Sequence, residues 1–134
     1  MWYNTRRSRH KVMKMRPALI EKSDESWELA NQLRTDGKFD AAANRYYYSL
    51  FQAVKAYAVK VGKMREDEKV SVHLAVKRVI REEHEDVRVF GDAMEMRERG
   101  DYQSDHVAEI ELSHDFTYKA DLLRTHYRKL VVGQ

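Results

Sequence analysis

The sequence contains no cysteine, and it has one proline and five glycines among 134 residues. Without cysteine it forms no disulfide and no thiolate metal site, which suits a reducing compartment, so we expect a cytoplasmic protein. So few turn-forming residues disfavour a β-rich fold. No apolar run approaches the length of about 18 residues that a membrane span requires, so we expect no membrane-spanning segment.

Chemical motifs are also scarce. The sequence has no glycine-rich phosphate loop, no pair of carboxylates in a catalytic pattern and no His-Glu-x-x-His zinc motif. We therefore expect no cofactor and no metal ion.

Charge is distributed unevenly along the chain. Residues 1–16 carry no acidic side chain and six basic ones: Arg6, Arg7, Arg9, Lys11, Lys14 and Arg16. The other residues carry 19 of the 25 basic side chains and all 22 acidic ones, a net charge of −3. We expect residues 1–16 to form a flexible basic arm, which either contacts phosphates through a salt-sensitive attraction or has no role. Residues 17–134 are expected to form one domain.

The hydrophobic spacing is that of helices throughout. A first helix is expected from Pro17, a favourable residue for a first turn, to Asp36, with Gly37 as its left-handed cap. A second helix is expected to have Asp40 as its N-terminal cap and to end at Gly62.

Three further helices are expected: one capped by Ser71, one that includes residues 90–97, and one that begins near Ser113. The apolar stripes predict the following core: Trp27, Leu29, Ala30, Leu33, Ala43, Tyr47, Leu50, Val54, Tyr57 or Ala58, Val61, Val72, Ala75, Val76, Val79, Ile80, Phe90, Ala93, Met94, Phe116, Ala120, Leu123, Tyr127 and Leu130. The short connections predict an all-α fold, a four- to five-helix up-and-down bundle.

Three consecutive tyrosines, residues 46–48, lie inside the second helix. Successive helical residues point about 100° apart, so the three rings do not all face one core. At least one of them is expected to be partly exposed, to face a subunit interface or to form a hydrogen bond through its hydroxyl group. One interpretation is that Tyr47 and Phe51 belong to the core while Tyr46 or Tyr48 lies at an interface.

Two further features are candidates for function. His73 lies beside the apolar stripe of the third helix, where it is either a structural residue or a ligand-binding one. Around the end of the fourth helix, five polar side chains lie close together in the sequence: Arg97, Arg99, Asp101, Tyr102 and His106. They form either a solvated helix end with ion pairs or one site for phosphate, in which arginine binds the oxygens and histidine transfers protons. Because Arg97 and Asp101 are four residues apart, we expect them to pair on one helix face.

Several of these residues form a pattern similar to that of a known family. The run Ala43-Asn44-Arg45-x-Tyr47-Tyr48-Ser49-x-Phe51, followed by His73 and by Arg97-x-x-x-Asp101-Tyr102, resembles the small HEPN-domain proteins of bacteria and archaea. The resemblance covers about residues 25–130. It implies an HEPN-like helical bundle, a homodimer, and a gene that is paired with a minimal nucleotidyltransferase in a toxin–antitoxin module.

The resemblance also bears on catalysis, because many HEPN proteins are metal-independent endoribonucleases with an arginine followed after four to six residues by a histidine. Arg99 and His106 are separated by six residues and match this spacing, which makes them the candidate catalytic pair. In the subgroup that the chain most resembles, the matching arginine is Arg97, and Asp101-Tyr102 stand where other members have the histidine. This departure favours binding over cleavage.

We therefore expect a component of a nucleotidyltransferase-associated module that binds nucleotide, RNA or a partner protein through Arg97, Asp101, Tyr102, Arg45 and His73. One alternative is an endoribonuclease in which His106 accepts the 2′-hydroxyl proton and Arg99 or Arg97 stabilises the phosphate. A second alternative is a dimeric helical scaffold without catalysis.

Overall fold

The computed structural model describes residues 5–67, 72–102 and 105–133, with side chains from residue 18 onward. These ranges contain α1 (Thr5–Thr35), α2 (Phe39–Lys60), α3 (Val72–Glu82), α4 (Val87–Tyr102) and α5 (His114–Val132), and the 3-10 helix η2 (Glu109–Leu112). No residue in them lies in a β-strand, so the predicted all-α bundle is confirmed. No helix among them is long and apolar enough to cross a membrane.

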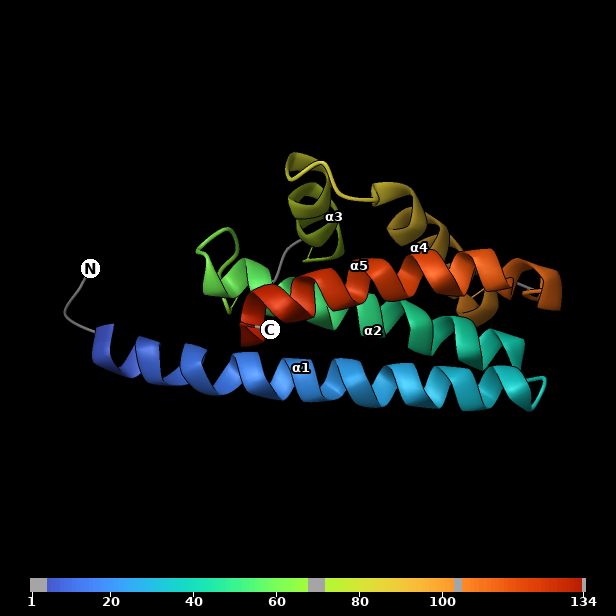
Figure 1. Ribbon diagram of the computed structural model, residues 1–134, viewed down its shortest axis with the longest axis horizontal. Coiled ribbons are helices and arrows are strands. Elements are labelled where there is room, and N and C mark those ends of the chain that lie inside the picture. Colours follow the sequence, from blue (N-terminus) through green and yellow to red (C-terminus); the bar gives the residue numbers. More distant parts are fainter. Residues whose placement is uncertain (1–4, 68–71, 103–104, 134) are drawn as a thin grey trace.

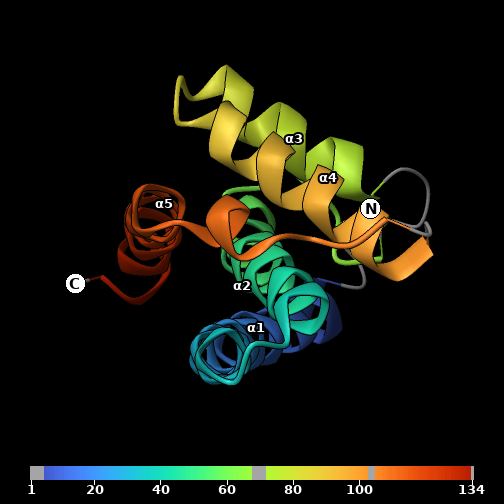
Figure 2. The ribbon, with the colours of Figure 1, turned by 90° about the vertical axis from the view of Figure 1, so that its right-hand side faces the viewer.

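Helix α2 is the centre of the bundle. Helices α1 and α2 lie side by side in opposite directions, and α5 runs along α2 on another side (Figure 1). Figure 2, which looks along the bundle, shows α2 in the middle, with α1 and α5 beside it and the α3–α4 hairpin across its remaining face. Twelve of the 22 residues of α2 are buried, which places this helix in contact with the rest of the core.

Small side chains allow α1 and α2 to pack closely. Ser23 and Ser49 are fully buried, and each donates its hydroxyl proton to the backbone carbonyl of the other, at 2.8 and 2.9 Å. Ala30 and Ala42 are also fully buried. The reciprocal bonds satisfy two hydroxyl groups that would otherwise be costly to bury.

The helix ends differ in part from the sequence predictions. Helix α1 begins at Thr5 and continues through Pro17, because favourable helix formers such as arginine, lysine and methionine fill the preceding segment. Helix α2 begins without a side-chain cap, so the capping role predicted for Asp40 is wrong. Ser71 lies outside the described residues. Ser113 does cap α5, since its hydroxyl oxygen accepts from the Phe116 N–H at 3.1 Å.

Most of the predicted core is buried or partly buried, and three of its members are exposed. Leu29, Val61 and Leu130 are 47%, 45% and 41% exposed. Leu29 lies next to Ala30, the residue that faces α2, while Val61 and Leu130 lie at helix ends where less of the neighbouring helix remains to cover them. Periodicity identifies the buried face of a helix but not the point at which its partner stops.

The structure confirms that at least one of the three tyrosines is partly exposed or hydrogen-bonded through its hydroxyl group. Tyr46 and Tyr47 are both fully buried and Tyr48 is half-buried. The Tyr46 hydroxyl donates to Asn31 Oδ1 at 2.6 Å, and the Tyr47 hydroxyl is hydrogen-bonded to Nδ1 of His73. Tyr46 therefore belongs to the core of a single chain, and Tyr48 alone of the three is available for an external contact.

Candidate functional site

Cationic and aromatic side chains from α2 and α4 meet on one side of the bundle. Arg45 and Tyr48 are three residues apart and share a face of α2, and the Arg45 guanidinium carbon lies 5.3 Å from the Tyr48 ring centre. Arg97 and Tyr102 come from α4. We call these four residues the tyrosine–arginine surface. Arginine stacked on aromatic rings is an arrangement that also accepts bases and phosphates.

Arg97 is the centre of this surface. Its guanidinium carbon lies 5.0, 5.6 and 5.8 Å from the ring centres of Tyr47, Tyr48 and Tyr102. The side chain is only 8% exposed, whereas Tyr102 is 75% exposed. Nη1 donates to the Tyr48 hydroxyl at 3.3 Å, and the buried Nε has no hydrogen-bond partner among the described residues. Because Nε is enclosed, an external acceptor can bind this arginine only through its Nη groups.

Asp101 lies beside this surface but does not pair with Arg97 as expected. Its Oδ2 accepts a hydrogen bond of 2.8 Å from Asn44 Nδ2 on α2. Asn44 Oδ1 in turn accepts from Arg45 Nε at 2.9 Å. The Asp101–Asn44–Arg45 chain ties the end of α4 to α2 and orients the Arg45 guanidinium group over Tyr48.

Arg99 has a different environment, because two steps along a helix turn a side chain by about 200°. Its five N–H groups make two hydrogen bonds to Glu95, two to Glu111 and one to the carbonyl oxygen of His106. The hydrogen bonds to Glu111 and Glu95 raise the pKa of Arg99 above its already high ordinary value. Arg99 therefore holds the segment around η2 against α4 and has no donor left for a phosphate.

His106 lies against the start of α2. Its Nδ1 is 2.7 Å from Asp40 Oδ2, and Asp40 Oδ1 accepts from the Val107 N–H at 2.8 Å. The hydrogen bond and the negative charge of Asp40 raise the pKa of His106. Burial alone would raise the pKa of Asp40, but the hydrogen bonds from His106 and Val107 outweigh burial and lower it. The imidazole side chain is 85% exposed, and its Nε2 makes no hydrogen bond to a described residue.

The five residues predicted to form one phosphate site thus lie in two places. Arg97 and Tyr102 belong to the tyrosine–arginine surface, and Asp101 borders it through Asn44. Arg99 and the ring of His106 contact Glu95, Glu111 and Asp40 instead. His73, which the sequence placed apart, lies against the Tyr47 ring and edge-on to the Tyr48 ring, and so adjoins the tyrosine–arginine surface.

A family model for the HEPN domain matches residues 17–127. The chain belongs to the HEPN family. The match runs from residue 17 in α1 to residue 127 in α5 and includes α2, α3 and α4, so both clusters lie within the HEPN domain. A comparison with curated proteins finds no match.

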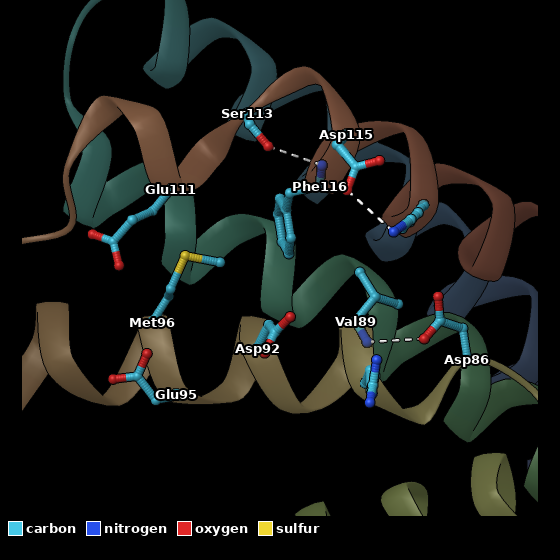
Figure 3. A pocket seen from close by; sticks show the side chains of 11 residues that line it. Asp86, Val89, Asp92, Glu95, Met96, Glu111, Ser113, Asp115 and Phe116 are labelled. Atoms are coloured by element: carbon cyan, nitrogen blue, oxygen red, sulfur yellow. Dashed lines mark hydrogen bonds and ion pairs between the residues drawn. The ribbon is translucent and has the colours of Figure 1, made fainter.

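A cavity of about 600 Å³ also opens between α4 and α5 of this HEPN domain. Figure 3 shows Asp92, Glu95 and Met96 from α4 on one side of it, and Glu111, Asp115 and Phe116 on the other. Asp86 is a further carboxylate in its lining, and Arg88 and Lys119 are the cationic residues there. Five carboxylates against two cations repel a phosphate, so this cavity does not suit a nucleotide.

Sequence reasoning did not identify Asp40 or Asn44 as members of the two clusters. Asp40 is 66 residues from His106, and no local pattern joins residues at such a separation. Asn44 is part of the Asn-Arg-x-Tyr-Tyr-Ser run that resembles the family, and this was the one signal that could have pointed to it. Its contact with Asp101 required the packing of α2 against α4.

Proposed function

We propose that this HEPN domain binds a nucleotide unit, either a free nucleotide or part of an RNA strand, at the tyrosine–arginine surface. The observation that carries the proposal is the contrast between two arginines two residues apart. Arg99 uses all its donors on protein acceptors, whereas among the described residues Arg97 donates only one hydrogen bond, from Nη1 to Tyr48. The Nε of Arg97 is enclosed by protein, so a bound phosphate would accept from the Nη groups, whose donors are not all used by the described residues.

The rings around Arg97 suit the other part of a nucleotide. Tyr102 exposes 75% of its surface and Tyr48 is half-buried, so a base can stack on either ring while its phosphate contacts an arginine. Arg45 adds a second positive charge over Tyr48. Stacking of this kind tolerates any base, so we expect weak sequence preference.

The wider role follows from the family and remains part of this proposal. HEPN domains often dimerise, and we expect a cytoplasmic homodimer that acts in a toxin–antitoxin module with a minimal nucleotidyltransferase. An adjacent gene for such an enzyme would support this role. Tyr48, the one tyrosine of the run with exposed surface, is available either to the nucleotide or to the partner.

The binding proposal is tested with fluorescein-labelled oligouridylate and with uridine 5′-monophosphate at constant salt concentration. We expect Tyr102→Ala to weaken binding of the oligonucleotide about 5- to 150-fold, because stacking of a base on an aromatic ring contributes about 1–3 kcal/mol. Arg97→Lys keeps the charge but loses the planar group of donors, and we expect a loss of about 10-fold. Affinity measured by fluorescence anisotropy and calorimetry checks both.

The matched control is Arg88→Ala, which removes an exposed arginine from the other end of α4 and should leave affinity close to that of the wild type. Wild-type affinity in both Tyr102→Ala and Arg97→Lys would refute the proposal. If the wild type binds neither probe, the surface does not bind nucleotides, and a protein partner becomes the better explanation.

A second candidate function is metal-independent cleavage of RNA, favoured by the Asp40–His106 pair. Asp40 fixes the His106 ring through Nδ1, which leaves Nε2 exposed for proton transfer. If His106 is the general base, His106→Ala lowers the rate of cleavage of a long RNA about 10² to 10⁴-fold. Equal product formation by the wild type and by His106→Ala, on gels of end-labelled RNA, would exclude this assignment.

A further inference from the structure

His73 is fixed against the rings beneath the tyrosine–arginine surface. It lies in the first turn of α3, half-buried, with its ring centre 4.8 Å from that of Phe51 and 5.5 Å from that of Tyr47. The ring centre of Tyr48 is 6.3 Å away. His73 therefore adjoins the same pair of tyrosines on which the guanidinium group of Arg97 stacks.

The position of the ring proton follows from Tyr47. Tyr47 is fully buried, burial raises the pKa of its hydroxyl further above the ordinary value, and the hydroxyl therefore keeps its proton. Within the described part of the chain, Nδ1 of His73 is the partner of that hydroxyl. Tyr47 thus donates to Nδ1, and in a neutral imidazole the ring proton is then on Nε2. Nε2 makes no hydrogen bond to a described residue.

The surroundings of His73 favour the neutral ring in the unliganded protein. Burial lowers the pKa of His73, and the positive charge of Arg97 lowers it further. Lys55 on α2 acts in the same direction, while Glu98 on α4 opposes them. A neutral His73 with Nε2 protonated cannot accept a proton from a substrate at that atom, but it can donate a hydrogen bond to one.

We propose that His73, oriented by Tyr47, is the second donor of the tyrosine–arginine surface and binds the phosphate of the nucleotide unit through Nε2–H. This inference rests on the proposed function, and it assigns His73 a binding role instead of a catalytic one. Arg97 and His73 both lie against Tyr47 and Tyr48, so in this proposal one phosphate binds between the two donors while its base stacks on Tyr48 or Tyr102.

The arrangement makes binding depend on pH. An anionic phosphate next to His73 offsets the effect of Arg97 and Lys55 and raises the pKa of the histidine in the complex. The pKa of His73 is below the ordinary value of about 6.5 in the free protein and higher in the complex. At a pH between these two values, binding of the phosphate is accompanied by uptake of a proton by His73. Affinity is greatest at low pH and falls as pH rises through this window.

The test uses the 2′-O-methyl uridine dinucleotide, since its phosphodiester neither titrates between about pH 5 and 8 nor can be cleaved through a 2′-hydroxyl group. His73→Phe keeps the ring packing and removes the donor, and His73→Gln keeps a terminal N–H donor that cannot titrate. We expect His73→Phe to weaken binding about 10-fold. We expect the affinity of His73→Gln for the dinucleotide to depend little on pH. Uridine has no phosphate, so its affinity should not depend on pH in this range for any variant. The control is His114→Phe, at an exposed position of α5.

A second readout separates binding from a merely structural role. In NMR spectra of the imidazole nitrogens, His73 should be the Nε2-protonated form in the free protein, and its pKa should rise when the dinucleotide saturates the wild type. An unchanged pKa of His73 in the complex, or wild-type affinity in His73→Phe, would overturn the inference. If Tyr102→Ala and Arg97→Lys weaken binding but His73→Phe does not, the inference fails alone. If the wild type does not bind, both proposals fail.

Discussion

Replacing Phe90 with alanine will lower the free energy of unfolding by about 3–5 kcal/mol, the cost of emptying a large buried aromatic site. Phe90 is fully buried on α4, and its ring centre lies 5.3 Å from that of Tyr47. Because Tyr47 supports both Arg97 and His73, the variant should also bind nucleotide more weakly than the wild type. Urea denaturation measures the free energy of unfolding, and its slope with urea concentration should be the same for the variant and the wild type. Fluorescence anisotropy measures the affinity for nucleotide.

Two comparisons make the Phe90 prediction specific. Tyr118→Ala removes a ring that is 59% exposed on α5, so the free energy of unfolding should change by no more than about 0.5 kcal/mol. Phe90→Leu leaves a smaller cavity and should destabilise less than Phe90→Ala. A similar stability for Phe90→Ala and Tyr118→Ala would mean that α4 does not pack against α2 in the way the structure shows.

Gly100→Val will destabilise the domain by about 1–3 kcal/mol, because it forces side-chain atoms into a filled space. A Cβ atom at position 100 would lie 3.2 Å from both Cβ and Oδ1 of Asp40 and 3.4 Å from its Cα. Glycine at this position therefore lets α4 approach the start of α2. Displacing Asp40 should also move the pKa of His106 back down towards its ordinary value, since Asp40 raises it. Thermal unfolding and NMR titration of His106 measure these two changes.

Gly91 provides a matched control within the same helix. A Cβ atom at this position would meet only Nζ of Lys77, at 3.9 Å. Gly91→Ala should therefore raise stability by about 0.5–1 kcal/mol through the better helix propensity of alanine. Destabilisation by Gly91→Ala, or tolerance of valine at position 100, would contradict the observed packing of α4.

The helices and most of their buried faces could be predicted from the sequence because the signals are local. Apolar residues recur at three- and four-residue steps in α2 and α3, and Gly37 and Gly62 adopt the positive φ expected of residues that end helices. Ser113 caps α5 as predicted. Each of these features depends on residues within about two helical turns, a separation at which helix geometry fixes the neighbours.

The candidate site could be predicted only in part. Arg97 and Tyr102 were identified by a short motif, and His73 was noted as a candidate beside an apolar stripe. The sequence could not show which of Arg97 and Arg99 keeps free donors, since both are arginines near the same helix end. The distinction lies in what each contacts: rings from α2 around Arg97, and carboxylates including Glu111 of η2 around Arg99.

Sequence alone thus determined an all-helical HEPN domain and the cluster of polar residues near the end of α4. Tertiary structure decided which residues contact one another: Asp40 with His106, Asn44 with Asp101, and Tyr47 with His73. Local spacing fixes the direction of a side chain around its own helix. Which donors remain free depends on acceptors supplied by other helices, and those come into reach only when the bundle packs.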